Sequence, residues 1–258
     1  MYDKYIKEFV SDEAYYSDFR FITNSQLGLI KKSPATYQHY RDYPSLRPQT
    51  KALNFGRAFH MCMLEPEKFD ERVIQEPDVN KRTKAGREEY EEFVKENEDN
   101  TILTSAEHKS LMGMRNRLFS CHEAVDLLSG GVAEQVAIWK DKDTGIECKC
   151  KADYWNKDKR ILVDIKTTQV ANMNEFRGSA YKYGYDRQSA FYSDGFKADD
   201  FVFIVIEKNA PYNIGIYYSG EEFLSDGRSK YSQLLNTYKH YFIDKVQDPY
   251  EHTYLGTL

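Results

Sequence analysis

The sequence predicts an α/β protein in which helices flank a central mixed β-sheet, and three observations indicate this class. Helix-period segments occupy the first half of the chain, whereas strand-like runs begin after Gly130-Gly131. Three consecutive strand-like runs are followed by a helix, two further strands and a final helix, an order typical of such a layered fold. The 258 residues, of which 41% are hydrophobic, are enough to enclose a large core. We expect a single domain over residues 1–258.

Residues 1–125 are expected to be mainly helical. Thr23-Asn24-Ser25 and Ser33-Pro34 are helix start signals, and residues 51–64 repeat with a helical period. Thr104/Ser105 precede an apolar helical stripe, and an acidic helix is expected over Glu88–Glu98. The basic residues before that acidic helix are Lys81, Arg82, Lys84 and Arg87. They are interpreted either as a solvated face or as a loop that touches phosphate.

Residues 130–220 are expected to form the core of the sheet. The strand-like runs are 132–139, 146–155, 160–167, 201–207 and 214–218. Turn signals at Asp141–Gly145 and Asn156–Lys159 separate the first three runs. Residues 172–197 are expected to be helical, and the last part of the chain, 221–258, to contain a C-terminal helix.

Charge and hydropathy exclude several classes of protein. The net charge of −5 excludes a basic nucleic-acid coat, although an enzyme needs only a local positive track. No segment approaches the roughly 20 apolar residues of a membrane span, and residues 1–16 are too charged for a signal peptide. We therefore expect no membrane partner and a cytoplasmic location. The four cysteines are expected to be free thiols.

Two of the predicted strands carry carboxylates. Strand alternation puts Lys149, Lys151 and Asp153 on one face of their strand, so the lysines are candidate phosphate contacts. In the next strand Asp164 and Lys166 share a face, and Asp164 interrupts a run of Ile, Leu and Val. A carboxylate in such a strand is costly unless it is paired or binds a metal.

The turn between these strands is expected to bring Asp153 and Asp164 together. Hard oxygen ligands of this kind suit Mg²⁺ or Mn²⁺. Lys166 would lie beside the metal, where a nearby cation would lower its pKa and allow it to act as a base. The alternative is an ordinary surface Asp and Lys on an edge strand, which the short D-x-K pattern alone favours.

His60 lies on an apolar helix and has two interpretations. It is either a hydrogen-bonded core histidine or, given the two aspartates expected nearby, a third metal ligand. Neutral imidazole is better suited to Mn²⁺ than to Mg²⁺.

These residues together resemble a known pattern. Asp153 followed by Asp164-Ile165-Lys166 resembles the core motif of the PD-(D/E)XK (restriction-endonuclease-like) nuclease superfamily, although Ala152 replaces its usual proline. The segment Gln188–Tyr192 is similar to the Q-x-x-x-Y motif of the RecB-like branch, and Gly56–His60 to its upstream G-x-x-x-H helix. Glu134 stands where many members carry an acidic residue on the first core strand.

Within that superfamily the chain most resembles the exonuclease VIII (RecE-type) group of phage recombination exonucleases. The segments SPATYQHY, GRAFHMCMLEPEKF and VDIKTT carry this resemblance, which covers roughly residues 20–215. It implies a metal-dependent exodeoxyribonuclease that degrades double-stranded DNA from its ends in phage-type recombination. It also implies a ring-shaped homo-oligomer and a single-strand annealing protein as partner.

The combined expectations assign a role to each candidate residue. The expected catalytic residues are Asp153, Asp164, Lys166 and Glu134. The expected metal ligands are His60, Asp153, Asp164 and the Ile165 carbonyl, with Mg²⁺ as cofactor and Mn²⁺ as substitute. The expected substrate-binding residues are Gln188, Tyr192, Lys149 and Lys151. No iron–sulfur cluster is expected, because no cysteine follows Cys150.

Two rival hypotheses remain. One is a catalytically inactive DNA-binding or recombination-scaffold protein of the same fold. The other is an unrelated α/β domain in which D-x-K is accidental, which five co-occurring motifs oppose.

Overall fold

A six-stranded mixed sheet forms the centre of the computed structural model, which describes residues 5–7, 12–48 and 50–251. Its strands are β1 (Tyr5–Lys7), β4 (Val132–Lys140), β5 (Glu147–Asn156), β6 (Ile161–Thr168), β7 (Asp200–Glu207) and β8 (Ile214–Tyr218), in that spatial order. Strands β6 and β7 are parallel, and the other neighbouring strands are antiparallel. The predicted α/β class with a mixed sheet is confirmed.

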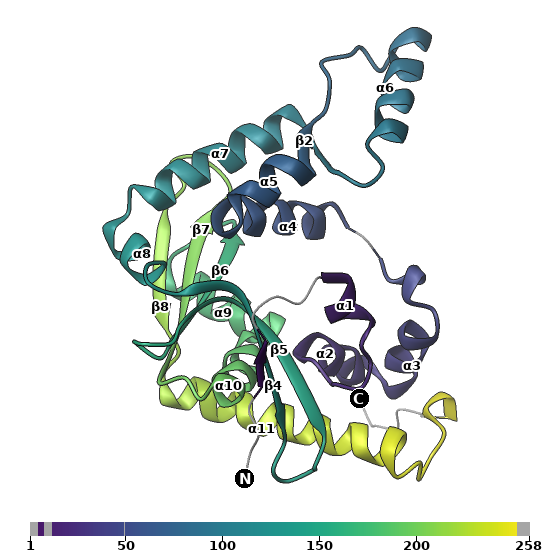
Figure 1. Cartoon of the computed structure of the whole chain (residues 1–258), viewed down its shortest axis with the longest axis vertical. Helices are drawn as coiled ribbons and strands as arrows, with labels where there is room; N and C mark the ends of the chain where they lie inside the picture. The colour runs from purple at the N-terminus through teal and green to yellow at the C-terminus, as the bar shows by residue number, and fades with distance from the viewer. Residues whose placement is uncertain (1–4, 8–11, 49, 252–258) are drawn as a thin grey trace.

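Helices cover both faces of the sheet (Figure 1). One face packs on α4 (Lys51–Leu64), α5 (Pro66–Arg72), α7 (Ser105–Phe119) and α8 (His122–Leu127). The other packs on α2 (Asn24–Lys32), α3 (Pro34–Asp42), α9 (Met173–Tyr183), α10 (Tyr185–Phe196) and α11 (Glu221–Tyr238). The remaining elements are α1 (Asp12–Ser17), α6 (Lys84–Glu96), the parallel pair β2 (Val73–Gln75) and β3 (Thr101–Leu103), and short helical turns at Pro44–Leu46, Lys239–Ile243 and Pro249–Glu251. Within the described ranges, no helix combines the length and hydropathy needed to cross a bilayer.

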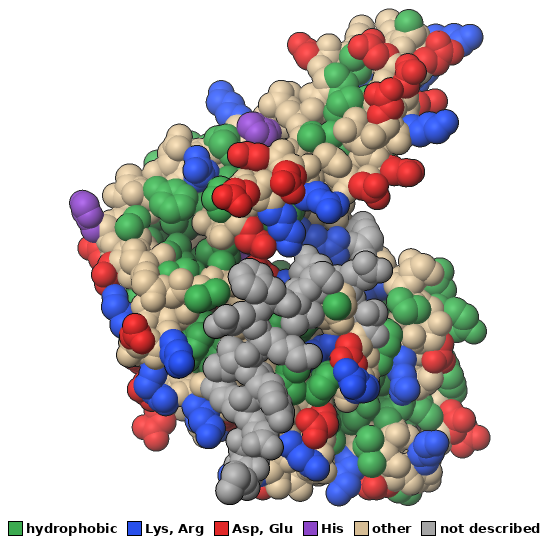
Figure 2. All heavy atoms as spheres, in the orientation of Figure 1, with side chains coloured by type: hydrophobic (Ala, Val, Ile, Leu, Met, Phe, Trp, Pro, Cys, Tyr) green, Lys and Arg blue, Asp and Glu red, His purple; other side chains and the backbone are tan. Residues whose placement is uncertain are grey.

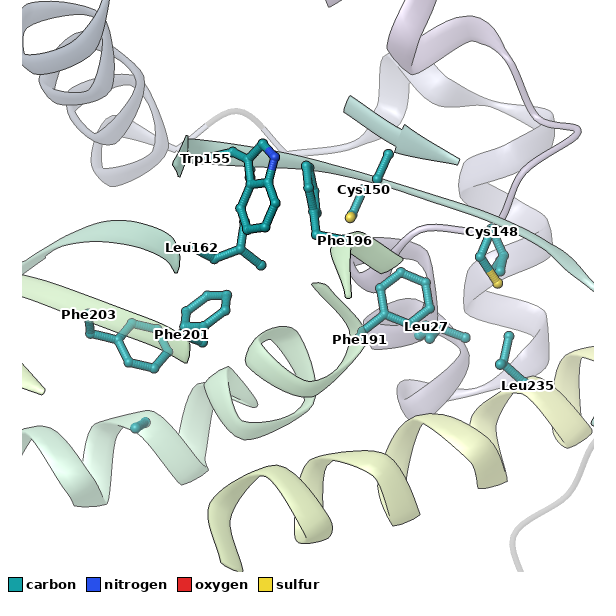
Figure 3. Close-up of a cluster of buried hydrophobic side chains, with 14 of the residues drawn as sticks. Leu27, Cys148, Cys150, Trp155, Leu162, Phe191, Phe196, Phe201, Phe203 and Leu235 are labelled. Atoms are coloured by element: carbon teal, nitrogen blue, oxygen red, sulfur yellow. The ribbon is translucent and has the colours of Figure 1, made fainter. Parts of the chain in front are cut away.

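Strand alternation divides the buried residues into two cores. In β6, Leu162 joins the core beneath α10 and α11, whereas Val163 and Ile165 join the core beneath α4 and α7. The first of these cores is rich in aromatic rings (Figure 3), with Trp155 and Phe196 at a centroid distance of 5.1 Å. A residue that faces either core is therefore removed from water, and a charged one needs a partner.

The predicted helix starts are confirmed, and their caps are formed by the expected residues. Thr23 and Thr104 each form a capping box with the residue three positions later. The single helix expected over 172–197 is instead two helices, because Gly184 adopts φ +73° and ends α9. The C-terminal helix begins at Glu221 and loses regular α-helical form after Tyr238, and residues 252–258 lie outside the described part of the chain.

Helix α6 stands on an arm that extends from the rest of the molecule (Figure 1), and acidic side chains dominate its visible surface (Figure 2). The basic residues near its start are already partnered in part. Lys81 Nζ lies 2.6 Å from Glu76 Oε2 and 3.5 Å from the centre of the Tyr90 ring, and Lys84 pairs with Glu88 at 3.7 Å. These contacts favour the interpretation of this run as a solvated face.

The feature that positions the candidate site is a fork between β5 and β6. Their ladder covers only Tyr154↔Val163, Trp155↔Leu162 and Asn156↔Ile161, so the strands separate at Asp153. Strand β5 continues beside β4, but Glu134 and Asp153 are left out of the residue pairing between these two strands. Glu134 has φ +54°, a left-handed conformation that is costly outside glycine. Because the pairing of β4 with β5 is interrupted here, the Glu134 and Asp153 carboxylates lie at the opening of the fork.

Candidate active site

Three potential metal ligands converge at the fork from three separate elements. His60 comes from α4, Glu134 from β4 and Asp153 from β5, and one ligand atom of each lies within 4.8 Å of the other two. His60 Nδ1 lies 3.3 Å from Asp153 Oδ1. Residues that span positions 60 to 153 of the sequence thus form a compact group of one imidazole and two carboxylates.

Asp153 is held at the point where the strands separate. Its Oδ2 accepts a hydrogen bond from the backbone N–H of Ile165 at 2.9 Å, which bridges β5 and β6. Burial raises the pKa of Asp153, but His60, Lys166 and the Ile165 N–H together outweigh burial and hold that pKa below its usual range. Asp153 is therefore an ionised carboxylate, the form that binds a cation.

Asp164 lies beside this group rather than in it. It is only 2% exposed, forms an ion pair with Lys166, and accepts a hydrogen bond from Gln188 Nε2 at 2.5 Å. Burial and the negative charge of Asp153 raise its pKa to about 6, although Lys166 opposes that shift. Its Oδ2 atom faces the Lys166 ammonium in this ion pair, so the buried charge has a partner.

Lys166 is the positive charge of the site. Burial lowers its pKa, but Asp164 and Asp153 raise the pKa above the ordinary lysine value. The raised pKa describes Lys166 as an ammonium that is suited to stabilising negative charge. The expected downward shift beside a bound cation, and with it the role of Lys166 as a base, stays a prediction.

The residues present fit a divalent cation. The carboxylates of Asp153 and Glu134 and the imidazole of His60, with ligand atoms within 4.8 Å of one another, are the donor types that Mg²⁺ and Mn²⁺ accept. His60, Glu134 and Asp153 would hold such an ion, with Asp164 adjacent. Ile165 contacts the site through its N–H, and the predicted role of its carbonyl stays a prediction.

Lys151 and Lys149 have partners within the protein. Lys151 forms an ion pair with Glu134, and burial raises the pKa of Glu134 although Lys151 opposes that shift. Lys149 is only 4% exposed, and its ammonium donates hydrogen bonds to the backbone carbonyls of Tyr15 and Asp18. The expectation that Lys149 contacts DNA is wrong for this arrangement, because alternation predicted its face but not the helix that covers that face.

We expect Lys149→Met to destabilise the fold rather than to weaken DNA binding. The substitution leaves two buried carbonyls without their donor, which costs about 1–3 kcal/mol. The melting temperature should fall by about 2–4 °C for each kcal/mol lost. Thermal unfolding would be compared with that of Lys142→Met, which alters an exposed lysine of the β4–β5 turn. Equal melting temperatures for the two variants would contradict the structural role.

Gln188 and Tyr192 have different surroundings although both belong to α10. Gln188 binds Asp164 directly, so it orients a carboxylate of the site. The Tyr192 ring packs near Phe201 at a centroid distance of 6.4 Å, and burial raises its pKa well above the ordinary value. The structure thus supports Gln188 as part of the site and describes Tyr192 as part of the wall behind it.

Sequence reasoning did not assign Tyr185 to the site. The Lys166 ammonium lies 5.1 Å from the centre of its ring, a cation–π contact. Tyr185 precedes Gln188 by three positions and therefore lies on the same helical face. That spacing was the available signal, but ordinary tyrosine packing produces the same pattern.

The fold and this site define a class of protein, an α/β domain with carboxylates and a lysine at the fork of a mixed sheet. Residues 23–250 match the family described as "PDDEXK-like domain of unknown function (DUF3799)", and the chain belongs to that family. The PD-(D/E)XK fold expected from the motifs is therefore confirmed, whereas membership of the RecE-type group specifically is not shown.

Solved structures give further similarities. A protein from Eubacterium rectale described as "Putative exonuclease" has a TM-score of 0.66 and 13% identity, over 98% of this chain and 97% of its own. A phage-related exonuclease from Haemophilus somnus 129PT has a TM-score of 0.33 and 12% identity, over 67% of this chain and 91% of its own. At these identities the first similarity concerns the fold alone. No curated protein matches the sequence.

His60→Ala distinguishes a ligand from a structural histidine. As a ligand, His60 contributes to metal affinity, so we expect the Mn²⁺ dissociation constant to rise at least about tenfold with little change in melting temperature. Calorimetric Mn²⁺ titration and thermal unfolding would measure the two effects. His108→Ala, which alters a half-buried histidine on α7, is the matched control. Unchanged metal affinity with a lowered melting temperature would make His60 a core residue.

Proposed function

We propose that this protein is a divalent-metal-dependent nuclease that hydrolyses phosphodiester bonds at the ends of double-stranded DNA. The observation that carries the proposal is the convergence of His60, Glu134 and Asp153 directly beside the Asp164–Lys166 pair. Phosphodiester hydrolysis needs a cation site for the phosphate and a positive group for the charge that develops during the reaction. The group of carboxylates with a protonated lysine provides both.

Each residue of the site has a distinct task in this proposal. When bound, Mg²⁺ or Mn²⁺ supplies Lewis-acid polarisation of the phosphate and activation of water. Asp153, Glu134 and His60 hold that ion, and the Ile165 N–H fixes the orientation of Asp153. Lys166 donates hydrogen bonds to the phosphate oxygens as their negative charge increases. Gln188 keeps Asp164 in position against Lys166.

The finer assignments rest on the sequence resemblance and belong to the same proposal. Action from DNA ends, the ring-shaped homo-oligomer, the annealing partner in phage-type recombination, the preference for Mg²⁺ and a cytoplasmic location are all implied by the RecE-type segments. The description of the structurally similar protein from Eubacterium rectale as a putative exonuclease is consistent with action at ends.

Digestion of two matched substrates tests the proposal. A linear duplex with labelled ends and a covalently closed duplex of the same sequence would be incubated with Mg²⁺, with Mn²⁺ and with a chelator. We expect nucleotide release from the linear substrate only, and only with metal. Asp126→Asn, which changes an exposed aspartate paired with Lys159, should digest DNA at the wild-type rate. Cutting of the closed duplex would indicate an endonuclease, and binding without any cutting would favour the scaffold hypothesis.

A further inference from the structure

Two neighbouring tyrosine rings lie between the protein surface and the lysine of the site. Tyr183 is 62% exposed, and its ring centre lies 6.0 Å from that of Tyr185 at an interplanar angle of 36°. The Tyr185 ring in turn lies 5.1 Å from the Lys166 ammonium. Tyr183 therefore contacts solvent, and Tyr185 lies between it and the Lys166 ammonium.

The local backbone explains why both rings lie next to each other. Gly184 separates them and adopts φ +73°, which ends α9 and starts α10 in one residue. The Tyr185 ring is supported from inside by Phe203, at 5.8 Å and a nearly parallel angle of 30°. The inner ring is thus held in place, whereas the outer ring presents an uncovered face.

A single exposed tyrosine is common and indicates no function. This one differs because its ring adjoins that of Tyr185, which contacts Lys166, and because a second cation accompanies it. Lys182 Nζ lies 5.5 Å from the centre of the Tyr183 ring. Aromatic rings interleaved with cations are the arrangement by which proteins stack bases and hold the phosphates between them.

We propose that Tyr183 and Tyr185 form a stacking subsite for the base of the nucleotide whose phosphate lies at Lys166. A base is joined to its phosphate through one sugar, so the ring that receives the base must lie near Lys166, as Tyr185 does at 5.1 Å with Tyr183 next to it. The base must leave its pair to stack, so the subsite selects a frayed terminal nucleotide. Because every base has an aromatic face, the subsite tolerates any sequence. This inference rests on the proposed nuclease function and adds the group that is recognised.

The test is a cycle of two proteins and two substrates. The rate at which the terminal nucleotide is released in a single turnover would be measured for the wild-type protein and for Tyr183→Leu. Each protein would receive DNA with a normal terminal nucleotide and DNA with an abasic one. Separate substrates would carry the abasic nucleotide at the 5′ end and at the 3′ end. We expect the leucine variant to be about 5- to 150-fold slower on normal DNA, the range that corresponds to base stacking, and unchanged on abasic DNA. Tyr183→Phe should behave as wild type.

Tyr218→Leu is the matched control, because Tyr218 is 59% exposed on the edge strand β8 and shares the strand face of Ile216, which packs on the α4 side of the sheet. It should leave both rates unchanged. Equal slowing of Tyr183→Leu on both substrates, or no slowing on either, would overturn the proposal.

A binding measurement separates this inference from the proposed function. A terminal 2-aminopurine, bound with Ca²⁺ in place of Mg²⁺, should lose fluorescence on wild-type protein and on Tyr183→Phe but not on Tyr183→Leu. If the protein binds and quenches this probe yet cuts no DNA with Mg²⁺ or Mn²⁺, the nuclease proposal fails and the stacking subsite stands. If it cuts DNA but all three proteins give the same fluorescence, the subsite fails and the nuclease proposal stands.

Discussion

Replacement of Asp153 by Asn is expected to abolish both metal binding and DNA cleavage while the protein stays folded. Asp153 is the ionised carboxylate that joins His60 to the Ile165 N–H across the fork. Asparagine has nearly the same shape and retains one oxygen for that N–H, but it lacks the negative charge. Loss of residues that merely orient metal ligands typically costs 10- to 100-fold. Loss of a ligand should therefore exceed about 100-fold.

Calorimetric titration with Mn²⁺ and the rate of nucleotide release would measure the two effects of Asp153→Asn. Asp199→Asn is a suitable control, because Asp199 is an exposed aspartate that is paired with Arg160 and is not among the site residues. Thermal unfolding shows whether the fold is kept. Wild-type metal affinity in a folded Asp153→Asn protein would remove Asp153 from the ligand set and would leave the grouping at the fork without its central member.

Lys166→Met is expected to lower the rate of cleavage about 100- to 1000-fold with metal affinity retained. The carboxylates hold Lys166 protonated, so the substitution removes a charge that stabilises the transition state, and one such donor typically contributes this amount. Methionine keeps most of the buried stem, which limits the effect on packing. The loss should appear in the rate of a single turnover and not in the affinity for DNA.

A further consequence concerns the neighbour of Lys166. Without the ammonium, Asp164 loses the partner that opposes the upward shift of its pKa, so that pKa should rise further from about 6. Lys157→Met is the matched control, since it removes an exposed lysine of the turn between β5 and β6. A Lys166→Met protein that cleaves within about threefold of the wild-type rate would exclude the role proposed for this lysine.

The local signals of the sequence were sufficient for most of the fold. Thr23 and Thr104 cap the predicted helices, and the strand runs over 132–139 and 160–167 match β4 and β6 closely. These features depend on neighbouring residues alone, which is why periodicity and capping reveal them. The strands β1, β2 and β3 were not predicted, because three residues are too few to show alternation.

The surroundings of the site residues were less predictable. Lys149 and Lys151 share a face of β5 as alternation requires, but what covers that face depends on α1, Tyr15 and Glu134. Likewise, the structure brings Asp153 together with Glu134 and His60, whereas the expected role of Asp164 as a second metal ligand stays a prediction. Contacts between distant segments decide such neighbours, and no local pattern records them.

The sequence by itself determined the fold class and the candidate residues for the chemistry, because motif spacing and strand alternation are properties of the chain. Only the tertiary structure decided which of these residues meet. In that structure β5 and β6 separate at Asp153, and Glu134 adopts a left-handed conformation beside the opening. Carboxylates surround Lys166 and raise its pKa. The physical reason is that burial and the distances between charges set ionisation and ligand geometry, and both are fixed only when the segments pack together.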